Sequence, residues 1–140
     1  MNLGDRFETN ITYTQAEVQA FAQLTGDTNP IHLDESYAAN TAFKRPIIHG
    51  MLTASVFSKI LGMDFPGEGT IYLKQSLVFK RPMFVNTPYQ VICEVMEINE
   101  RRGAATISTQ IFETDSEQLV LQGEASIINK KKIRKPKAST

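Results

Sequence analysis

Hydrophobic and polar residues recur at two different spacings along this chain. Before residue 63, the apolar residues recur every three or four positions, which is the spacing of a helix with one buried face. From residue 69 onward they alternate with polar residues, which is the spacing of a strand with one buried face. The pattern therefore predicts helices in the first part of the chain and strands in the second.

Three helices are predicted in the first part. Thr14 and Glu17 have the spacing of a capping box, and Gly26 can end the helix that follows them in a left-handed conformation. A second, short helix is expected after Asp34, which can serve as its cap. The third is predicted over residues 50–62. These carry apolar or small side chains on nearly every side and a single charge, which is typical of a buried helix.

Four strands are predicted in the second part, over residues 70–80, 89–98, 104–114 and 118–128. The alternating apolar residues of the first strand are Ile71, Leu73, Leu77 and Phe79. Short turns between consecutive strands indicate an antiparallel sheet. One buried helix and one long sheet predict an α+β fold in which the sheet wraps around the helix. Because a second copy could cover an exposed edge strand of such a sheet, we expect a homodimer.

Length and composition limit the class of protein. A chain of 140 residues suits one domain with one core, which we place in residues 1–129. No apolar run approaches the roughly 18 residues of a membrane span, and the acidic residues near the N-terminus predict no export signal. The single cysteine, Cys93, allows no intramolecular disulfide and no metal cluster of the Cys/His kind. We expect a cytoplasmic protein with no membrane partner and no metal ion.

Charge is unevenly distributed, although it sums to zero. Residues 130–140 contain six of the 15 Lys and Arg residues and no acidic residue, so residues 1–129 carry a net charge of −6. A run of like charges with one apolar residue predicts a solvated, disordered tail, and attraction to a polyanion is the alternative. The negative charge of the remaining chain argues against a nucleic-acid-binding domain.

The segment GDTNPIH, residues 26–32, contains the strongest candidates for chemistry. Pro30 fixes its own φ and favours an extended preceding residue, so a stiff turn joins Asp27 to His32. A carboxylate beside an imidazole can take a proton from water and return it near neutral pH. Each residue alone also has a structural interpretation, as a turn or capping group for Asp27 and as a packing or surface residue for His32.

A second candidate element is the start of the buried helix at Gly50. The free N–H groups and the positive end of the helix dipole can stabilise an oxyanion there, and glycine lets a ligand approach the backbone closely. His49 is explained equally well as a cap, a packing residue or a participant. If the GDTNPIH turn lies over this helix start, water activation and oxyanion stabilisation meet at one place.

The other groups give weaker signals. Lys80 and Arg81 could meet a phosphate, although a solvated strand end explains them better. The sequence contains no G-x-S-x-G, no Gly-rich phosphate loop and no H-E-x-x-H. Nucleophile-elbow hydrolases, P-loop enzymes and zincins are therefore not supported.

The segments FAQLTGDTNPIHLDESYA, TAFKRPIIHGML and KQSLVFKRPMFV together resemble the MaoC-like, (R)-specific enoyl-CoA hydratase family, also called hydratase 2. The resemblance covers most of residues 14–90 and includes each fixed position of the signature G-D-x-N-P-[apolar]-H. It implies the hot-dog fold, in which a curved antiparallel sheet wraps a long helix. It also implies a short homodimeric bacterial type that supplies (R)-3-hydroxyacyl-CoA for polyhydroxyalkanoate synthesis.

The resemblance implies roles for six residues. Asp27 and His32 match the catalytic dyad, which holds one water against C3 of a trans-2-enoyl thioester and returns a proton to C2. Gly50 matches the glycine whose amide binds the thioester carbonyl. The other matches are Asn29, which supports the turn of the dyad, and Ser58 and Leu61, which line the acyl pocket.

The leading hypothesis is reversible hydration of trans-2-enoyl-CoA to (R)-3-hydroxyacyl-CoA, which needs an acid/base pair and an oxyanion donor but no metal and no organic cofactor. A thioesterase or an acyl-carrier-protein dehydratase on the same fold commonly places a carboxylate on the central helix, and residues 50–62 contain none. A non-catalytic acyl-thioester-binding module is the third hypothesis. The intact dyad argues against it, because a binding module does not need one.

Overall fold

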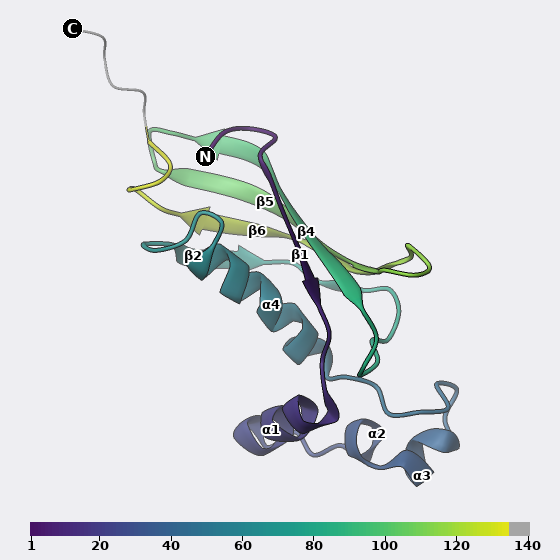
Figure 1. The fold of residues 1–140 in the computed structure, drawn as a ribbon. Helices are drawn as coiled ribbons and strands as arrows, with labels where there is room; N and C mark the ends of the chain where they lie inside the picture. Colours follow the sequence, from purple (N-terminus) through teal and green to yellow (C-terminus); the bar gives the residue numbers. More distant parts are fainter. Residues whose placement is uncertain (135–140) are drawn as a thin grey trace, which may run out of the picture.

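The computed structural model describes residues 1–134 (Figure 1). Its helices are α1 (Gln15–Thr25), α2 (Pro30–Leu33), α3 (Glu35–Ala39) and α4 (Gly50–Met63). Its strands are β1 (Arg6–Ile11), β2 (Ile71–Gln75), β3 (Val78–Phe79), β4 (Tyr89–Asn99), β5 (Ala104–Glu113) and β6 (Leu119–Ile128). α4 lies along one face of the sheet, and α1, α2 and α3 lie together beyond one end of it (Figure 1).

The strands form one antiparallel sheet in the order β1-β4-β5-β6-β2, and β3 also pairs with β6. The three long strands β4, β5 and β6 are consecutive neighbours, as the short turns between them predict. The sheet curves around α4 (Figure 1). The predicted α+β architecture, a hot-dog fold, is confirmed.

The local helix signals are confirmed. The hydroxyl of Thr14 accepts a hydrogen bond from the N–H of Glu17 (3.2 Å), and the Glu17 carboxylate accepts one from the N–H of Thr14 (2.9 Å). Gly26 ends α1 with φ 81°. Asp34 caps α3 by accepting a hydrogen bond from the N–H of Tyr37 (3.0 Å). These contacts span at most four residues, which is why the sequence pattern predicts them correctly.

The strand at residues 70–80 differs from the prediction, because it is divided into β2 and β3. At the break, Ser76 donates its N–H to the carbonyl of Glu124, and its hydroxyl accepts from the N–H of Glu124, both at 2.9 Å. A Cβ on Gly123 of β6 would lie only 1.8 Å from the carbonyl oxygen of Ser76. The two backbones approach so closely that position 123 requires glycine.

The same segment is also more exposed than its alternating pattern suggests. Ile71, Leu73 and Phe79 have 58%, 54% and 50% of their surface exposed. β2 lies at an edge of the sheet. β1, at the opposite edge, is not predicted by the pattern, because none of its six residues is fully buried and most are polar.

The core lies between α4 and the sheet. The buried apolar residues of α4 are Ala54, Val56, Phe57, Ile60 and Leu61. Those of the sheet are Tyr89, Val91, Cys93, Val95, Ala105, Ile107, Ile111, Val120, Leu121, Ala125 and Ile127. Each large apolar side chain buried here contributes about 1.5–3 kcal/mol, so this layer supplies most of the stability. Burial also raises the pKa of the Cys93 thiol to about 12, so this thiol stays protonated near neutral pH.

The prediction of a disordered C-terminal tail is wrong for the first residues of that tail. Residues 130–134 form a turn that packs back on the domain, and Ile133 within it is 2% exposed and belongs to the core. A single apolar residue among like charges is enough to anchor this turn, because the turn directs that residue inward while the charged residues stay exposed. The predicted disorder of residues 135–140 lies outside the described residues.

Asn129 is the residue that makes this turn. It is fully buried, and its Oδ1 accepts hydrogen bonds from the N–H groups of Lys131 (3.1 Å) and Lys132 (3.0 Å). Its Nδ2 donates to the carbonyl of Glu68 (3.0 Å) and to the hydroxyl of Thr70 (3.1 Å). One side chain therefore ties the C-terminal turn to the loop between α4 and β2.

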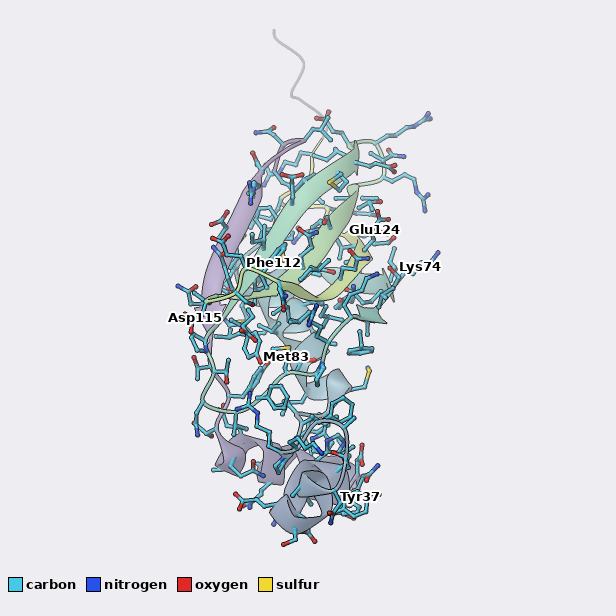
Figure 2. All side chains as sticks on the ribbon, turned by 90° about the vertical axis from the view of Figure 1, so that its right-hand side faces the viewer. Tyr37, Lys74, Met83, Phe112, Asp115 and Glu124 are labelled. Carbon is cyan, nitrogen blue, oxygen red and sulfur yellow. The ribbon has the colours of Figure 1, made fainter. Side chains whose placement is uncertain are left out.

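A buried residue connects helices α1, α2 and α3 with the sheet. Met83, which is 3% exposed, lies between the sheet and the helices, whereas Tyr37 lies at the outer tip (Figure 2).

Within residues 1–134, no helix is both long enough and apolar enough to span a membrane.

Candidate active site

The segment that follows α1 carries the two residues predicted to form a dyad. Asn29 caps α2, because its Oδ1 accepts a hydrogen bond from the N–H of Ile31 (3.2 Å) and its carbonyl accepts one from the N–H of His32 (3.0 Å). Pro30 is the first residue of α2, a position that needs no N–H donor. The predicted stiff turn is therefore in part a helical turn, and it holds His32 within it.

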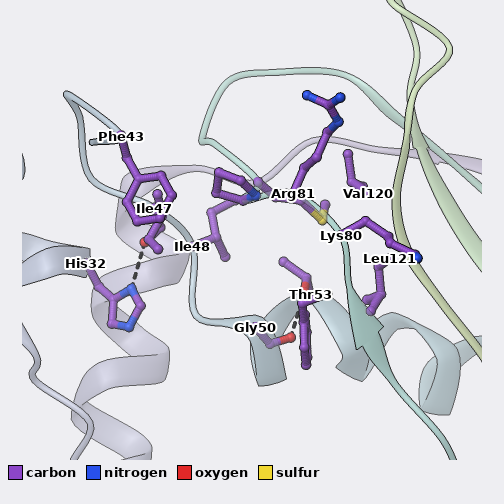
Figure 3. Close-up of a pocket in the computed structure, with 13 residues that line it drawn as sticks. His32, Phe43, Ile47, Ile48, Gly50, Thr53, Lys80, Arg81, Val120 and Leu121 are labelled. Carbon is purple, nitrogen blue, oxygen red and sulfur yellow. Dashed lines mark hydrogen bonds between the residues drawn. The ribbon is translucent and has the colours of Figure 1, made fainter. Parts of the chain in front are cut away.

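His32 is held in one orientation. Its side chain is almost buried, and its Nδ1 lies 2.7 Å from the carbonyl oxygen of Ile47 (Figure 3). Because a carbonyl can only accept, Nδ1 carries a proton and donates it. In the neutral ring, Nε2 then has a free lone pair and can accept a proton from water.

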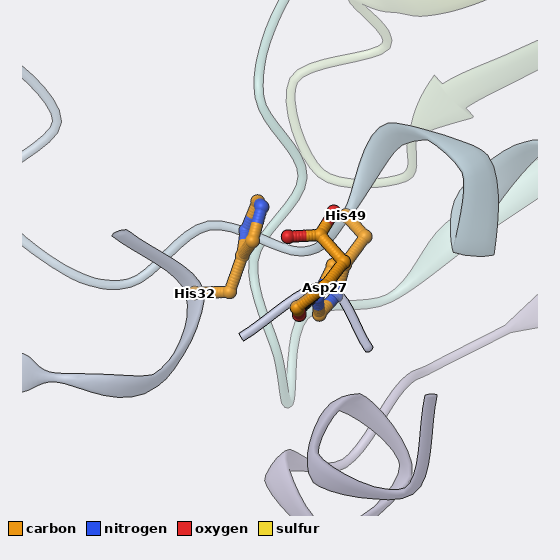
Figure 4. Close-up of side chains that lie close together, drawn as sticks. All are labelled: Asp27, His32 and His49. Carbon is orange, nitrogen blue, oxygen red and sulfur yellow. Dashed lines mark hydrogen bonds between the residues drawn. The ribbon is translucent and has the colours of Figure 1, made fainter. Parts of the chain in front are cut away.

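Asp27 lies beside His32, as the dyad requires. Its Oδ1 accepts a hydrogen bond from the N–H of Asn29 (3.4 Å). A carboxylate oxygen of Asp27 and one ring nitrogen each of His32 and His49 lie within 4.8 Å of one another (Figure 4). One water molecule can bridge polar atoms at such a separation. The structure therefore brings the two predicted dyad residues together.

His49 completes this cluster. It is 2% exposed and stacks on His32, with 3.9 Å between the ring centroids and 28° between the ring planes. Its Nε2 lies 2.9 Å from the backbone carbonyl oxygen of Asp27. As the residue before α4, His49 makes no side-chain capping bond. His49 is therefore the N-cap residue of α4 by position, but its side chain does not cap the helix, and the packing interpretation is correct but incomplete.

Asp27, His32 and His49 are also the residue types that bind metal ions, but their geometry suits proton transfer better. The lone pairs of an imidazole lie in the plane of its ring. Because the two rings are stacked, their lone pairs run side by side and do not converge on one ion at the usual distance of about 2 Å.

Gly50 is the first residue of α4 and lies across from the dyad. Within residues 1–134, its N–H donates to no protein acceptor, whereas the N–H groups of Leu52 and Thr53 both donate to the carbonyl of His49. A Cβ at position 50 would lie 2.7 Å from Cε1 of Phe79. The glycine thus leaves a free amide at the helix start and room for the Phe79 ring.

His32 and Gly50 line the same cleft, which has a volume of about 370 Å³ (Figure 3). Asp27 is not among the residues that line it, but it lies beside His32. The walls are mainly apolar and include Phe43, Ile47, Ile48, Phe79, Met83 and Leu121. An apolar cleft with an imidazole on one side and a free amide on another is suited to polarising a carbonyl compound.

Two cations also line this cleft. Lys80 and Arg81 contribute to its wall, and neither forms an ion pair with another residue of the described chain. Their backbone N–H groups both donate to the carbonyl of Val120, at 2.8 Å and 3.2 Å, which fixes the segment that carries them. The interpretation of these residues as a solvated strand end therefore omits their position beside the dyad.

The two predicted acyl-pocket residues lie elsewhere. Ser58 is exposed on α4 and lines a second cavity of about 440 Å³, together with Met51, Tyr72 and Leu77. Leu61 is fully buried in the core and lines neither cavity. The structure does not bring these two residues into the cleft of the dyad, and their contact with an acyl chain stays a prediction.

Tyr13 contacts the first turn of α4, but it is not a suitable acid or base. Its hydroxyl donates to the carbonyl of Leu52 (3.3 Å). Burial, assisted by the negative charge of Glu17, raises the pKa of Tyr13 to about 12. It therefore keeps its proton near neutral pH.

Comparison with known proteins agrees with this geometry. The family model described as "MaoC like domain" matches residues 3–116, which is most of the chain. The chain belongs to this family. The resemblance inferred from the sequence motifs is therefore confirmed for the MaoC-like domain as a whole.

Two relatives and one solved structure show what this MaoC-like domain is similar to. It is 46% identical to the (R)-specific enoyl-CoA hydratase of Aeromonas caviae over 127 residues, which cover 91% of this chain and 94% of the relative. It is 40% identical to the 3-hydroxybutyryl-CoA dehydratase of Methylorubrum extorquens, over 81% of this chain and 71% of that protein. Among solved structures, the (R)-hydratase from A. caviae involved in PHA biosynthesis matches with a TM-score of 0.87 and 46% identity, over 92% of this chain and 97% of that one.

Sequence reasoning on this MaoC-like domain underestimated His49 and the pair Lys80 and Arg81. Both signals were present, because His49 directly precedes Gly50 and the two cations directly precede a proline. Their contacts, however, join segments that are far apart in the chain. Only the fold shows that His49 faces the carbonyl of Asp27 and that Lys80 and Arg81 line the dyad cleft.

Proposed function

We propose that this MaoC-like domain catalyses the reversible addition of water to trans-2-enoyl-CoA, giving (R)-3-hydroxyacyl-CoA. The observation that carries the proposal is the arrangement of the cleft. The free amide of Gly50 and His32 line it together, and Asp27 lies within reach of His32. The relative from A. caviae, of nearly the same length, is named for this reaction and for its (R) stereochemistry.

The dyad supplies the proton transfers of this reaction. The oxygen of a water molecule held between Asp27 and His32 forms a bond to C3 of the enoyl group, and the proton that it loses passes to the pair. A proton from the pair then forms a bond to C2. Hydration therefore leaves the pair in its original state, and no oxidant, metal or organic cofactor takes part.

Gly50 stabilises the charge that develops during the addition. As water attacks C3, electrons move through C2 to the carbonyl oxygen of the thioester, which becomes enolate-like. The N–H of Gly50 at the start of α4 points a donor and the positive end of a helix dipole at such an oxygen. The loss of one oxyanion donor typically costs a hundredfold or more in rate, so this contact is about as valuable as the dyad.

A CoA thioester is the form of substrate that the cleft favours. CoA carries phosphate groups, whereas residues 1–129 carry a net charge of −6 and would repel an anion. Lys80 and Arg81 place two positive charges in the cleft wall, where they can contact those phosphates. We therefore propose CoA as the carrier and not an acyl carrier protein.

The deciding experiment is an assay of the full chain with trans-2-butenoyl-CoA. We expect loss of the absorbance of the conjugated thioester and formation of the (R) product, measured by chiral chromatography. Unchanged substrate would refute the proposal, and an (S) product would refute its stereochemistry. The same assay with the enoyl group on an acyl carrier protein tests the carrier: a higher kcat/KM for that substrate contradicts our assignment of CoA.

We also propose that Ser58 and Leu61 bound the acyl pocket. Ser58 lines the second cavity, and Leu61 follows on the same helix in the adjoining core. A Ser58→Leu substitution should lower kcat/KM more for a long enoyl chain than for a four-carbon one. An equal change for both lengths would argue against this assignment.

A homodimer is proposed from the two edges of the sheet. The β1 edge carries charged residues, including an Arg6–Glu8 ion pair (3.0 Å). The β2 edge instead exposes Ile71, Tyr72 and Leu73, which are apolar, and an edge of this kind attracts a second chain. Light scattering should give twice the chain mass for the wild type and a smaller mass for Leu73→Glu. A monomeric wild type would refute this proposal.

The biological role is proposed from the product. An (R)-3-hydroxyacyl-CoA is a monomer for polyhydroxyalkanoate synthesis or an intermediate of fatty acid metabolism, and the A. caviae relative of known structure is involved in PHA biosynthesis. Cys93 is a free, buried thiol, which is consistent with a reducing cytoplasm. Fractionation of cells that produce the chain, followed by the assay above, tests this location.

A further inference from the structure

His49 has a buried nitrogen with no hydrogen-bond partner. Nδ1 of its ring is the single buried side-chain nitrogen or oxygen of the described residues that lacks one. An unpaired buried polar atom lowers stability, so a position that needed only a packing residue would favour an apolar ring. The cost suggests that the other ring nitrogen has a function that an apolar side chain cannot provide.

The second nitrogen of the ring has a definite partner. Nε2 lies 2.9 Å from the backbone carbonyl oxygen of Asp27, and the two residues are 22 positions apart in the chain. Since the carbonyl accepts, Nε2 carries the proton and Nδ1 is the bare nitrogen. A bare nitrogen is the less costly one to leave unpaired, because no N–H is buried without an acceptor.

The two faces and the backbone of His49 define the rest of its surroundings. One face stacks on His32, and the ring of Phe21 meets it at an angle of 61° with 4.9 Å between centroids. The backbone of His49 leads directly into Gly50, and its carbonyl anchors the first turn of α4. The residue therefore contacts the backbone of Asp27, the ring of His32 and the start of α4.

We propose that His49 is a positioning residue of the site, which sets the distance between the dyad turn and the start of α4. Its Nε2–H donates to the carbonyl of Asp27, and its ring supports that of His32. His49 takes no proton in the reaction and contacts no substrate. This role rests on the hydratase function proposed above, but the hydrogen bond and the stacking do not depend on it.

The hydrogen bond can be tested first in the wild-type protein, without any activity. Nitrogen-15 NMR of histidine-labelled protein, at an alkaline pH at which imidazoles are ordinarily neutral, distinguishes the two tautomers of a ring. We expect the Nε2–H form for His49 and the Nδ1–H form for His32, with the signals assigned from His49→Gln. An Nδ1–H form for His49 would overturn the proposal, because its Nε2 could not then donate to Asp27.

The role in the reaction is tested with two variants that remove different parts of the ring. His49→Phe keeps an aromatic ring against His32 but loses the donor, whereas the side-chain amide of His49→Gln can reach the Asp27 carbonyl. For Phe we expect kcat to fall about tenfold or more with KM within about threefold, because the dyad is displaced while the cleft remains. Gln should restore kcat to at least about five times the Phe value.

Ile60→Val is the matched control for lost stability, because Ile60 is fully buried on α4 and does not line the cleft. It should lower the melting temperature and leave kcat unchanged. An unchanged kcat in His49→Phe would overturn the proposal, and so would equal kcat values in the Phe and Gln variants. If the wild type lacks hydratase activity, the proposed function fails, while the tautomer still decides the hydrogen bond.

Discussion

Between residues 14 and 49 many hydrogen bonds from side chains to the backbone hold the chain in place, whereas apolar contacts hold α4 against strands β4–β6. The first region, here called the helical end, has three short helices capped by Thr14, Asn29 and Asp34. The second, here called the sheet core, has a continuous set of buried apolar side chains.

The difference explains why the dyad belongs to the helical end. A hydrogen bond fixes both a distance and a direction, and so it can aim a ring or a carboxylate, whereas apolar contacts fix mainly a volume. His32 is oriented by one hydrogen bond to Ile47, and the carbonyl of Asp27 by one to His49. We therefore expect catalysis and stability to respond to different mutations.

The largest effect is expected from the dyad. Asp27→Asn and His32→Asn should each lower kcat at least about a hundredfold, which corresponds to about 2.7 kcal/mol of activation free energy. The asparagine at position 32 can still donate to the carbonyl of Ile47, so the fold is kept while the free ring nitrogen is lost. Steady-state kinetics and thermal melts check this result. Turnover near the wild-type value in either variant would mean that the dyad is wrongly assigned.

The opposite result, a loss of stability with little loss of activity, is expected for Asn129, which directly follows β6 of the sheet core. Asn129→Ala leaves the N–H groups of Lys131 and Lys132 without their acceptor, and so should lower the free energy of unfolding by about 2 kcal/mol. The kcat should stay within about twofold, because the residue is bonded to the far loop and not to the site. Urea unfolding measures the change. Asn99→Ala, at the exposed end of β4, removes the acceptor of the Arg102 N–H; it is the control and should cost far less.

Gly50 lies at the boundary between the two regions. Gly50→Ala keeps its N–H but places a Cβ 2.7 Å from the Phe79 ring, so we expect kcat/KM to fall about tenfold, or about 1.4 kcal/mol. Adding Phe79→Leu should recover part of this loss by removing the clash. Gly62→Ala is the control, because no atom lies within 4 Å of a Cβ there. A fully active Gly50→Ala would show that the approach of Phe79 does not limit the cleft.

The smallest effect is expected at the first cap of the helical end. Thr14→Ala removes the acceptor of the Glu17 N–H and should lower the free energy of unfolding by about 1 kcal/mol, with kcat unchanged. Thermal melts compared with Gln23→Ala, an exposed position of α1, measure this difference. Equal melting temperatures for the two variants would mean that the cap does not stabilise the native state.

The local features of the site were accessible from the sequence because their causes are local. The cap at Thr14, the helix end at Gly26 and the cap at Asp34 each involve residues within four positions of one another. Likewise, the dyad residues are five positions apart, and a proline between them limits their backbone. The spacing of GDTNPIH therefore predicted correctly that Asp27 and His32 lie close together. Their role as an acid/base pair stays a prediction.

Contacts between distant segments were not accessible in the same way. The division of the strand at Ser76 depends on Gly123, and the packing of Ile133 depends on the turn at Asn129. The exposure of Ile71 depends on which strand lies at the edge of the sheet. An alternating pattern shows that one face differs from the other, but it does not show whether a neighbour covers that face.

The sequence by itself determined the class of fold and the three main helices, and it predicted the two residues of the dyad, because hydrophobic spacing and turn chemistry act over a few residues. Only the tertiary structure decided that Gly50 lies in the same cleft as His32 and that His49 holds the turn of Asp27. Packing of α4 against the sheet fixes where the start of this helix lies. That packing depends on many apolar side chains at once, so no short stretch of sequence contains the information.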